Sequence, residues 1–137
     1  MTAYARFDLT SSDAELPSLA EGLESFALTH DLAPRLALEL QVVLDEVIVN
    51  ITHHGYQGEV GKPITVELKL DPGVVTIQVE DEARPFNPLM LPEPDLTRAV
   101  EQRTPGGLGV HLMRKLTDEV SYERLGDKNC LTLKKRV

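Results

Sequence analysis

Alternation of apolar and polar residues marks the strands of this chain. It is strictest on either side of Asp71-Pro72-Gly73, a turn sequence, so the two flanking segments are predicted to form a hairpin. Successive side chains of a strand point to opposite faces, which puts Val75, Ile77 and Val79 inward. The pattern predicts five strands in all: Ala3–Leu9, Lys62–Leu70, Val74–Asp81, Val120–Leu125 and Asn129–Lys135.

Apolar residues at helical spacing predict three helices. The first runs over Leu16–Thr29 and follows a Ser-Ser-Asp sequence that suits a turn and a helix cap. The second begins at Pro34, because proline suits a first helical turn, and ends near Gly55. The third follows a glycine-rich segment and carries apolar residues at i, i+4 spacing: Leu108, Leu112, Leu116 and Val120.

The order of these elements is strand-helix-helix-strand-strand-loop-helix-strand-strand, and it predicts the fold class. Strands joined by hairpins imply a mixed, mostly antiparallel sheet, and amphipathic helices imply that they cover one of its faces. We therefore expect an α+β fold, a two-layer sandwich, in a single domain over residues 1–137. Five prolines between residues 85 and 105 exclude a long helix there, although Asp95–Gln102 fits a short one.

Charge and composition narrow the functional classes. The chain has 14 basic and 22 acidic residues, a net charge of −8, which argues against a nucleic-acid-binding surface. The excess acids lie within residues 1–68, where they serve solubility or form an acidic face that steers a basic protein partner. No signal peptide or membrane-spanning apolar run is recognisable, and a single cysteine, Cys130, suits a reducing compartment, so we expect a cytoplasmic protein.

Polar residues lie beside the apolar stripe of the second helix. Glu46, Asn50 and His54 are spaced i, i+4, i+8 and share a face that borders the stripe. Asp45 is predicted to point away from the stripe into solvent. A carboxylate and an amide half in the core need partners, and together they could activate a hydroxyl group and hold a hydrated cation. The alternative, which this segment alone favours, is that they only solvate the edge of the helix.

Two further segments offer binding chemistry. Asp81 has the inward parity of its strand, so its carboxylate needs donors, either the exocyclic amine of a bound base or the backbone N–H groups of the next turn. The glycines before the third helix leave backbone N–H groups at a helix N-terminus, which form an anion site or else a plain glycine turn. Together the three segments supply a cation and base element, an acceptor for a purine amine and a phosphate cradle.

The same segments carry a resemblance to a known family. Leu44–Tyr56 is similar to an N box, E-x-x-x-N followed by H-x-Y, and Asp81–Pro88 is similar to a D-x-G-x-P-F-x-P box. Gly106–Val120 resembles a glycine box with its following helix, and Asn129–Leu133 is similar to the family's last strand. Over nearly its whole length the chain resembles the GHKL (Bergerat-fold) ATPases, and among them the bacterial anti-sigma-factor serine/threonine kinases.

The resemblance implies a Bergerat fold that binds ATP and Mg²⁺. It implies that Asn50 ligates the metal ion and that Glu46 is the catalytic base or orients the attacking group. It also implies that Asp81 accepts from the adenine amine, that Thr132 lies near the base, and that residues 88–105 form the ATP lid. The other nucleotide-binding positions that it implies are Ala83, Pro85, Phe86, Gly106, Gly107, Leu108 and Gly109.

Three functional hypotheses follow. The first is a kinase that phosphorylates a serine or threonine of an anti-anti-sigma antagonist and also binds a sigma factor; the family often forms homodimers. The second is a binding module without kinase activity, because Ala83 stands where the family has glycine and its methyl group could narrow the adenine site. The third, a detached histidine kinase domain, fits least well, because no dimerisation helices with a phosphoacceptor histidine are recognisable.

Overall fold

A computed structural model describes residues 2–90 and 107–137. The α1 helix and the β2–β3 hairpin lie where the sequence predicts them, and Ser12 caps a short 3₁₀ turn before α1 by accepting a hydrogen bond from the backbone nitrogen of Ala14 (3.2 Å). The elements are, in chain order, β1 (Ala3–Thr10), α1 (Leu16–Thr29), α2 (Pro34–Asn50), β2 (Pro63–Asp71), β3 (Val74–Asp81), α3 (Gly107–Leu116), β4 (Glu119–Leu125) and β5 (Lys128–Arg136).

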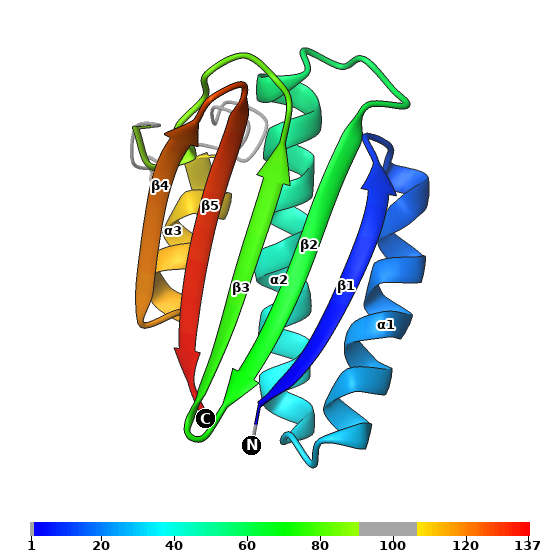
Figure 1. Ribbon diagram of the computed structural model, residues 1–137, viewed down its shortest axis with the longest axis vertical. Helices are drawn as coiled ribbons and strands as arrows, with labels where there is room; N and C mark the ends of the chain where they lie inside the picture. Colours follow the sequence, from blue (N-terminus) through cyan, green and yellow to red (C-terminus); the bar gives the residue numbers. More distant parts are fainter. Residues whose placement is uncertain (1, 91–106) are drawn as a thin grey trace.

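The strands form one sheet, and the three helices pack on one of its faces (Figure 1). The order across the sheet is β1-β2-β3-β5-β4, and every neighbouring pair of described strands is antiparallel. This is the predicted two-layer α+β sandwich with one correction. The expected mixed sheet has no parallel pair among the described strands, because the β4–β5 hairpin folds back and inserts β5 beside β3.

The core fills the space between the sheet and the helices. Val75, Ile77 and Val79 of β3 are buried there, as their parity predicts. The open face of the sheet is polar, and ion pairs such as Arg6–Glu67 link its neighbouring strands. A pocket with a mostly apolar lining can therefore form on the helix-covered face and not on the open one.

Two details of helix orientation differ from the sequence-based expectation. Asp45 is half-buried rather than solvated, because α2 packs against both α1 and α3, and this burial raises the pKa of its carboxyl group. In α3 the side chains that reach the core are Val110 and Met113, whereas Leu112 and Leu116 are half-buried. Because α3 contacts both α2 and β4, the leucine stripe lies at the edge of its contact surface.

The second helix does not remain α-helical up to Gly55. The α-helix ends at Asn50 and continues as a π-helical turn, Ile51–Gly55. Such turns are rare and are frequently found at functional sites. Three predicted features lie outside the described residues: most of the ATP lid, the short helix at Asp95–Gln102, and Gly106 of the glycine-rich segment. Among the described helices, none is long and apolar enough to cross a membrane.

Gly22 allows α1 to approach the sheet closely. A Cβ atom added there would lie 2.3 Å from Cε1 and 2.8 Å from Cζ of Phe7 on β1. We therefore expect Gly22→Ala to lower the free energy of unfolding by about 1–2 kcal/mol, although alanine is the better helix former, because the phenyl ring must move. Urea unfolding measures the effect, and the double variant with Phe7→Leu should recover part of it. An unchanged or higher stability of Gly22→Ala would contradict this packing.

Candidate functional site

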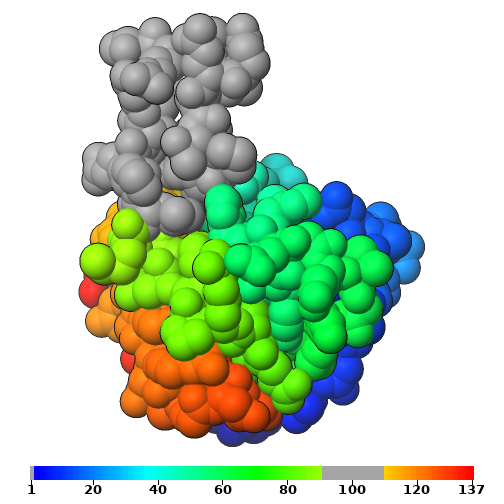
Figure 2. All heavy atoms as spheres, turned by 90° about the horizontal axis from the view of Figure 1, so that it is seen from above, coloured from blue at the N-terminus to red at the C-terminus, as the bar shows by residue number. Residues whose placement is uncertain are grey.

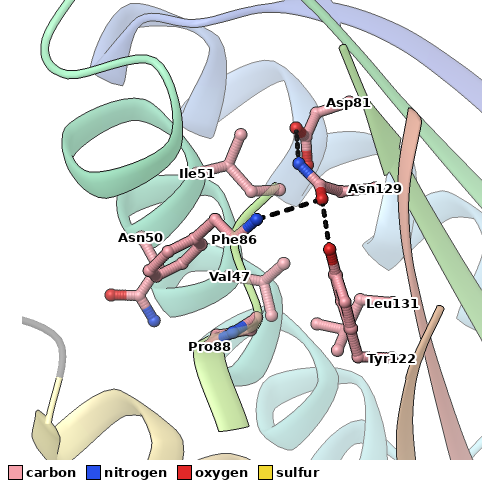
Figure 3. A pocket seen from close by; sticks show the side chains of 9 residues that line it. All are labelled: Val47, Asn50, Ile51, Asp81, Phe86, Pro88, Tyr122, Asn129 and Leu131. Atoms are coloured by element: carbon pink, nitrogen blue, oxygen red, sulfur yellow. Dashed lines mark hydrogen bonds between the residues drawn. The ribbon is translucent and has the colours of Figure 1, made fainter. Parts of the chain in front are cut away.

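A pocket lies between α2 and the helix-covered face of the sheet, near the end of β3 (Figure 3). α2 and the turn after it form one wall, the strands form another, and the segment after β3 closes the pocket. The space open to the centre of a water molecule is about 10 Å³, room for about one water, so a larger ligand requires side chains to move. The lining residues are Val47, Asn50, Ile51, Asp81, Phe86, Pro88, Tyr122, Asn129 and Leu131.

Asp81 turns its carboxylate into this pocket from the end of β3, as its parity predicts. Its Oδ1 accepts hydrogen bonds from the backbone nitrogen of Ala83 (3.0 Å) and from Nδ2 of Asn129 (2.8 Å). Burial raises the pKa of Asp81, while these two hydrogen bonds and the charge of Arg124 act to lower it. Asp81 therefore caps the following turn with one oxygen, and no described residue donates a hydrogen bond to the other.

Asn129 and Tyr122 belong to the site, and sequence reasoning missed both. Asn129 lies directly opposite Asp81 in the β3–β5 register and is buried, and its Oδ1 accepts a hydrogen bond from the Tyr122 hydroxyl group. The signal was present in the alternation of β5, because Asn129 has the same parity as Leu131 and Leu133, which face the core. The family resemblance directed attention to Thr132 instead.

Asn50 is the most unusual polar group of the site. Its side chain is 1% exposed, and neither Nδ2 nor Oδ1 has a hydrogen-bond partner among the described residues. Figure 3 shows the carboxamide beside the Phe86 ring, pointing away from Asp81. An unsatisfied buried amide costs free energy, so a native structure that keeps one calls for an explanation. A ligand or a hydrated cation would supply the missing partners.

Glu46 lies one helical turn before Asn50 on α2 and does not line the pocket. Its carboxylate is half-buried; burial, and after it the neighbouring charge of Asp45, raise its pKa. A carboxylate with a raised pKa holds a proton more readily at working pH, which is the property that a general base needs. Glu46 is adjacent in sequence to Val47 and one helical turn from Asn50, both of which line the pocket.

The predicted phosphate cradle coincides with the start of α3. The helix begins at Gly107, and Gly109 lies in its first turn, where backbone N–H groups have no partner within the helix. α3 packs against α2, the helix that carries Asn50. Gly106 and the side chain of Leu108 lie outside what the structure describes.

Arginines hold the segment that follows β3. Seen from above, this segment (lime) lies between the β4–β5 turn (orange) and the chain after α2 (green) (Figure 2). From β4, Arg124 Nη1 donates to the carbonyl oxygen of Ala83 (2.8 Å). Toward the turn after α2, Arg84 donates through Nε (3.3 Å) and Nη2 (3.0 Å) to the carbonyl oxygen of His54. These bonds fix the backbone that carries Asp81 and the residues after it.

Ala83 lies beside the pocket rather than in it. Its side chain is buried, it has no positive φ, and a Cβ added to Gly55 would lie 3.2 Å from its methyl group. The backbone here therefore tolerates alanine, and the methyl group packs against Gly55, outside the set of residues that line the pocket. We expect Ala83→Gly to lower the free energy of unfolding by about 1 kcal/mol. It should leave the ADP affinity, measured by calorimetric titration, within about twofold; a tenfold tighter affinity would show that the methyl group narrows the site.

The other predicted positions divide between the pocket and its surroundings. Phe86 lines the pocket, and its ring stacks on His54 with centroids 5.6 Å apart and an interplanar angle of 13°. Pro85 is exposed. Thr132 lies on the opposite face of the sheet, beside Gln78 and Ser121, because its neighbours Leu131 and Leu133 point into the core. The structure therefore does not bring Thr132 to the pocket.

Comparison with known proteins assigns the family. A family model described as the histidine kinase-like ATPase domain matches residues 9–135, so the chain belongs to this family. The chain is 31% identical over 111 residues to the serine/threonine-protein kinase BtrW of Bordetella bronchiseptica, a match that covers 81% of this chain and 78% of that protein. It is 28% identical over 89 residues to the anti-sigma F factor of Halalkalibacterium halodurans, which covers 60% of this chain and 56% of that protein.

Solved structures show the same fold. A chain of the SiaB-SiaC complex from Pseudomonas aeruginosa superposes with a TM-score of 0.64 at 16% identity, covering 97% of this chain and 88% of that one. The histidine kinase domain from the Erythrobacter litoralis EL346 blue-light activated histidine kinase gives a TM-score of 0.52 at 17% identity, covering 90% and 59%. The family recognised from the three sequence boxes and the fold class are thereby confirmed.

Proposed function

We propose that this protein is an ATP-dependent serine/threonine kinase of a partner-switching pathway, which phosphorylates an anti-anti-sigma antagonist. The observation that carries the proposal is the buried amide of Asn50, which lines the same pocket as Asp81, has no hydrogen-bond partner among the described residues and lies one helical turn after Glu46. The names of the relatives, a serine/threonine-protein kinase and an anti-sigma factor, support the same class. We further propose a sigma factor as the second partner and the cytoplasm as the location, since that is where sigma factors act, and a homodimer as a working form.

The residues present suit ATP and Mg²⁺. An amide oxygen is a hard ligand of the kind that Mg²⁺ accepts beside phosphate oxygens and water, and Asn50 offers one that has no partner among the described residues. Bound Mg²⁺ would neutralise the charge that develops on the phosphate oxygens during transfer. In the part of the chain that the structure describes, no group of three or more His, Cys, Asp or Glu residues could hold a metal ion. The metal would therefore be shared with the nucleotide.

Each of the chain's groups has a distinct role in the proposed reaction. Asp81 accepts a hydrogen bond from the adenine amine, and the backbone N–H groups at the start of α3 bind the phosphates. Glu46 takes the proton from the partner's hydroxyl group as its oxygen attacks the γ-phosphorus, and ADP leaves. Positioning and charge stabilisation provide most of the rate enhancement in such transfers.

The test is a phosphotransfer assay with ATP labelled at the γ-phosphate, Mg²⁺ and candidate antagonist proteins. The proposal predicts label on a serine or threonine of one antagonist, stable to acid and dependent on Mg²⁺. Label that is lost in acid would indicate a phosphohistidine and would contradict the assigned residue class. Binding to the antagonist or to a sigma factor without any transfer would contradict the kinase activity.

A second candidate function is a protein-binding module that does not use nucleotide. The small size of the pocket favours it, because about 10 Å³ does not admit a purine without movement of side chains. Calorimetric titration with ADP separates the two functions. Binding of ADP supports the kinase, whereas no binding at millimolar ADP supports the module.

A further inference from the structure

A second cavity lies at the other end of the sheet from the pocket that contains Asp81. Arg136 pairs with the first residue of β3 and Asn129 with the last, so the two cavities lie at opposite ends of the β3–β5 ladder. The turn between α1 and α2 and the end of β5 form this α1–α2 cavity, and Figure 1 shows both at the lower end of the molecule. The space open to the centre of a water molecule is about 440 Å³. The lining residues are Asp31, Leu32, Ala33, Arg35, Leu36, Glu39, Arg136 and Val137.

Two leucines form the more buried part of the lining, and backbone hydrogen bonds hold both walls. Leu32 and Leu36 are half-buried and pack against the core. The nitrogen of Leu32 donates to the carbonyl oxygen of Ala27 (2.9 Å), which fixes the turn to α1. The nitrogen of Val137 donates to the carbonyl oxygen of Gly73 (3.1 Å), which fixes the end of β5 to the β2–β3 turn. The cavity is therefore preformed, so an apolar side chain that enters it orders little of this chain on binding.

The α1–α2 cavity offers a ligand guanidinium groups rather than carboxylates. Both oxygens of Glu39 are occupied: Oε2 lies 3.2 Å from Lys135 Nζ, and Oε1 accepts from Arg35 Nε (3.1 Å). These two hydrogen bonds, the one to Lys135 first, lower the pKa of Glu39. Arg35 is 90% exposed and uses only Nε in this pair, and the guanidinium group of Arg136 has no partner among the described residues. Asp31 is the one acid of the lining whose carboxylate has no cation beside it among the described residues.

The openness of the cavity suits a segment of another protein. Most of its rim is exposed, whereas a site for a small molecule buries most of the ligand surface. A segment lying across the rim can place an apolar side chain against the leucines and a carboxylate on an arginine, a pair that is strong and often bidentate. The excess of acids elsewhere in residues 1–68 repels such a segment, so charge directs it to this cavity.

We propose that the α1–α2 cavity is a docking site for an acidic segment of the antagonist protein, which places a carboxylate on Arg136 and a neighbouring apolar side chain on Leu32 and Leu36. The inference rests on the proposed kinase function and adds a contact remote from the transferred phosphate. α2 has 17 residues and is about 25 Å long, and a folded domain of about 100 residues has a radius of gyration of about 13 Å. One antagonist domain is thus wide enough to reach both the cavity and the start of α3.

The experiment measures kcat and KM of phosphotransfer to the antagonist with the full-length protein and three variants. Arg136→Glu reverses the charge of the guanidinium group that has no described partner. Ala33→Glu adds a carboxylate at the rim, and because Ala33 is the N-cap residue of α2, where an acid stabilises the helix, this variant keeps its fold. Lys134→Glu is the matched control, because it reverses a charge on the open face of the same strand, outside the cavity. Thermal unfolding establishes that each variant is folded.

Both cavity variants should raise KM for the antagonist at least about tenfold and leave kcat within about twofold, because docking stabilises the bound antagonist and the transition state equally. The ADP affinity, measured by calorimetric titration, should stay within about twofold. Added salt should raise KM of the unmodified protein and of the control, and should have a smaller effect on Arg136→Glu. A lowered kcat or melting midpoint in place of a raised KM would indicate a structural role and overturn the docking site.

The outcomes separate the docking site from the kinase function. Phosphotransfer with the KM of the control in either cavity variant overturns the docking site and leaves the kinase function intact. If no antagonist is phosphorylated, the kinase function is overturned, and calorimetric titration of the same antagonists against the same variants decides the docking site. A tenfold loss of affinity in the cavity variants alone supports it, whereas equal affinities or no binding overturn it. Self-association that Arg136→Glu abolishes in analytical ultracentrifugation would make the occupant a second copy of this chain and would overturn the antagonist as occupant.

Discussion

Glu46→Gln is expected to lower the rate of phosphotransfer to the antagonist by about 10²–10⁴-fold. Glutamine keeps the size of the side chain but cannot take the proton of the attacking hydroxyl group. Because Glu46 does not line the pocket, the affinity for ADP should change by less than about twofold. The measurement is the initial rate of label transfer at saturating ATP, with ADP affinity measured on the same preparation.

Asp45→Asn is the matched control for this substitution, since it removes a neighbouring acid from the same helix outside the site. The charge of Asp45 raises the pKa of Glu46, so its removal lowers that pKa. Transfer requires ionised Glu46 and falls as the pH drops through its pKa; the acid limb of the rate should therefore lie at lower pH in Asp45→Asn. Full transfer by Glu46→Gln at any pH would exclude Glu46 as the base.

Asp81→Asn is expected to weaken ADP binding by about a hundredfold, because the amide replaces a charged acceptor of the adenine amine by a neutral group. The same substitution should not destabilise the ligand-free protein. The new Oδ1 can still accept from Ala83 N and from Asn129, the two donors that Asp81 has now. Calorimetric titration measures the affinity, and thermal unfolding measures the stability.

The sign of the stability change follows from the pKa of Asp81. Burial raises this pKa above 3.8, so the folded protein holds the proton to higher pH than the unfolded chain. The stability that the Asp81 carboxyl group contributes is then fully present below its pKa in the unfolded chain, and it is lost as the pH rises through its pKa in the folded protein. At pH 7 the neutral amide avoids this loss, so we expect the melting midpoint of Asp81→Asn to lie at or above that of the unmodified protein. A variant that binds ADP normally, or that unfolds more easily at pH 7, would contradict the role of Asp81.

Local patterns predicted most of the fold because each carried its own physical signal. α1 begins and ends at the predicted residues; in the hairpin β3 has its predicted bounds, and β2 is shifted by one residue from the predicted Lys62–Leu70 to Pro63–Asp71. Features that depend on packing were not predictable in this way. The half-burial of Asp45 arises from two helices that flank α2, and the order of β5 and β4 arises from a hairpin that folds back. Neither feature changes the local alternation of apolar and polar residues from which the elements were predicted.

The site was predicted best where the position of a residue in the alternation of a strand determines which face of the sheet its side chain points to. Asp81 points inward for the same reason as Val79, and this needed no family knowledge. On β5 the same alternation selects Asn129 and rejects Thr132, whose side chain lies on the other face of the sheet. The isolated amide of Asn50 could be suspected from its helix face, but only the packing around it showed that it lacks partners among the described residues.

The central claim is that the pocket between α2 and the sheet is a magnesium-dependent nucleotide site. Thermal unfolding of the purified protein with ATP or ADP, each with and without Mg²⁺, tests it most directly. A ligand at 100 times its dissociation constant stabilises the fold by about 2.7 kcal/mol. We therefore predict a rise of several degrees that depends on Mg²⁺, and a loss of the Mg²⁺-dependent part in Asn50→Ala. No rise at millimolar nucleotide would contradict the claim.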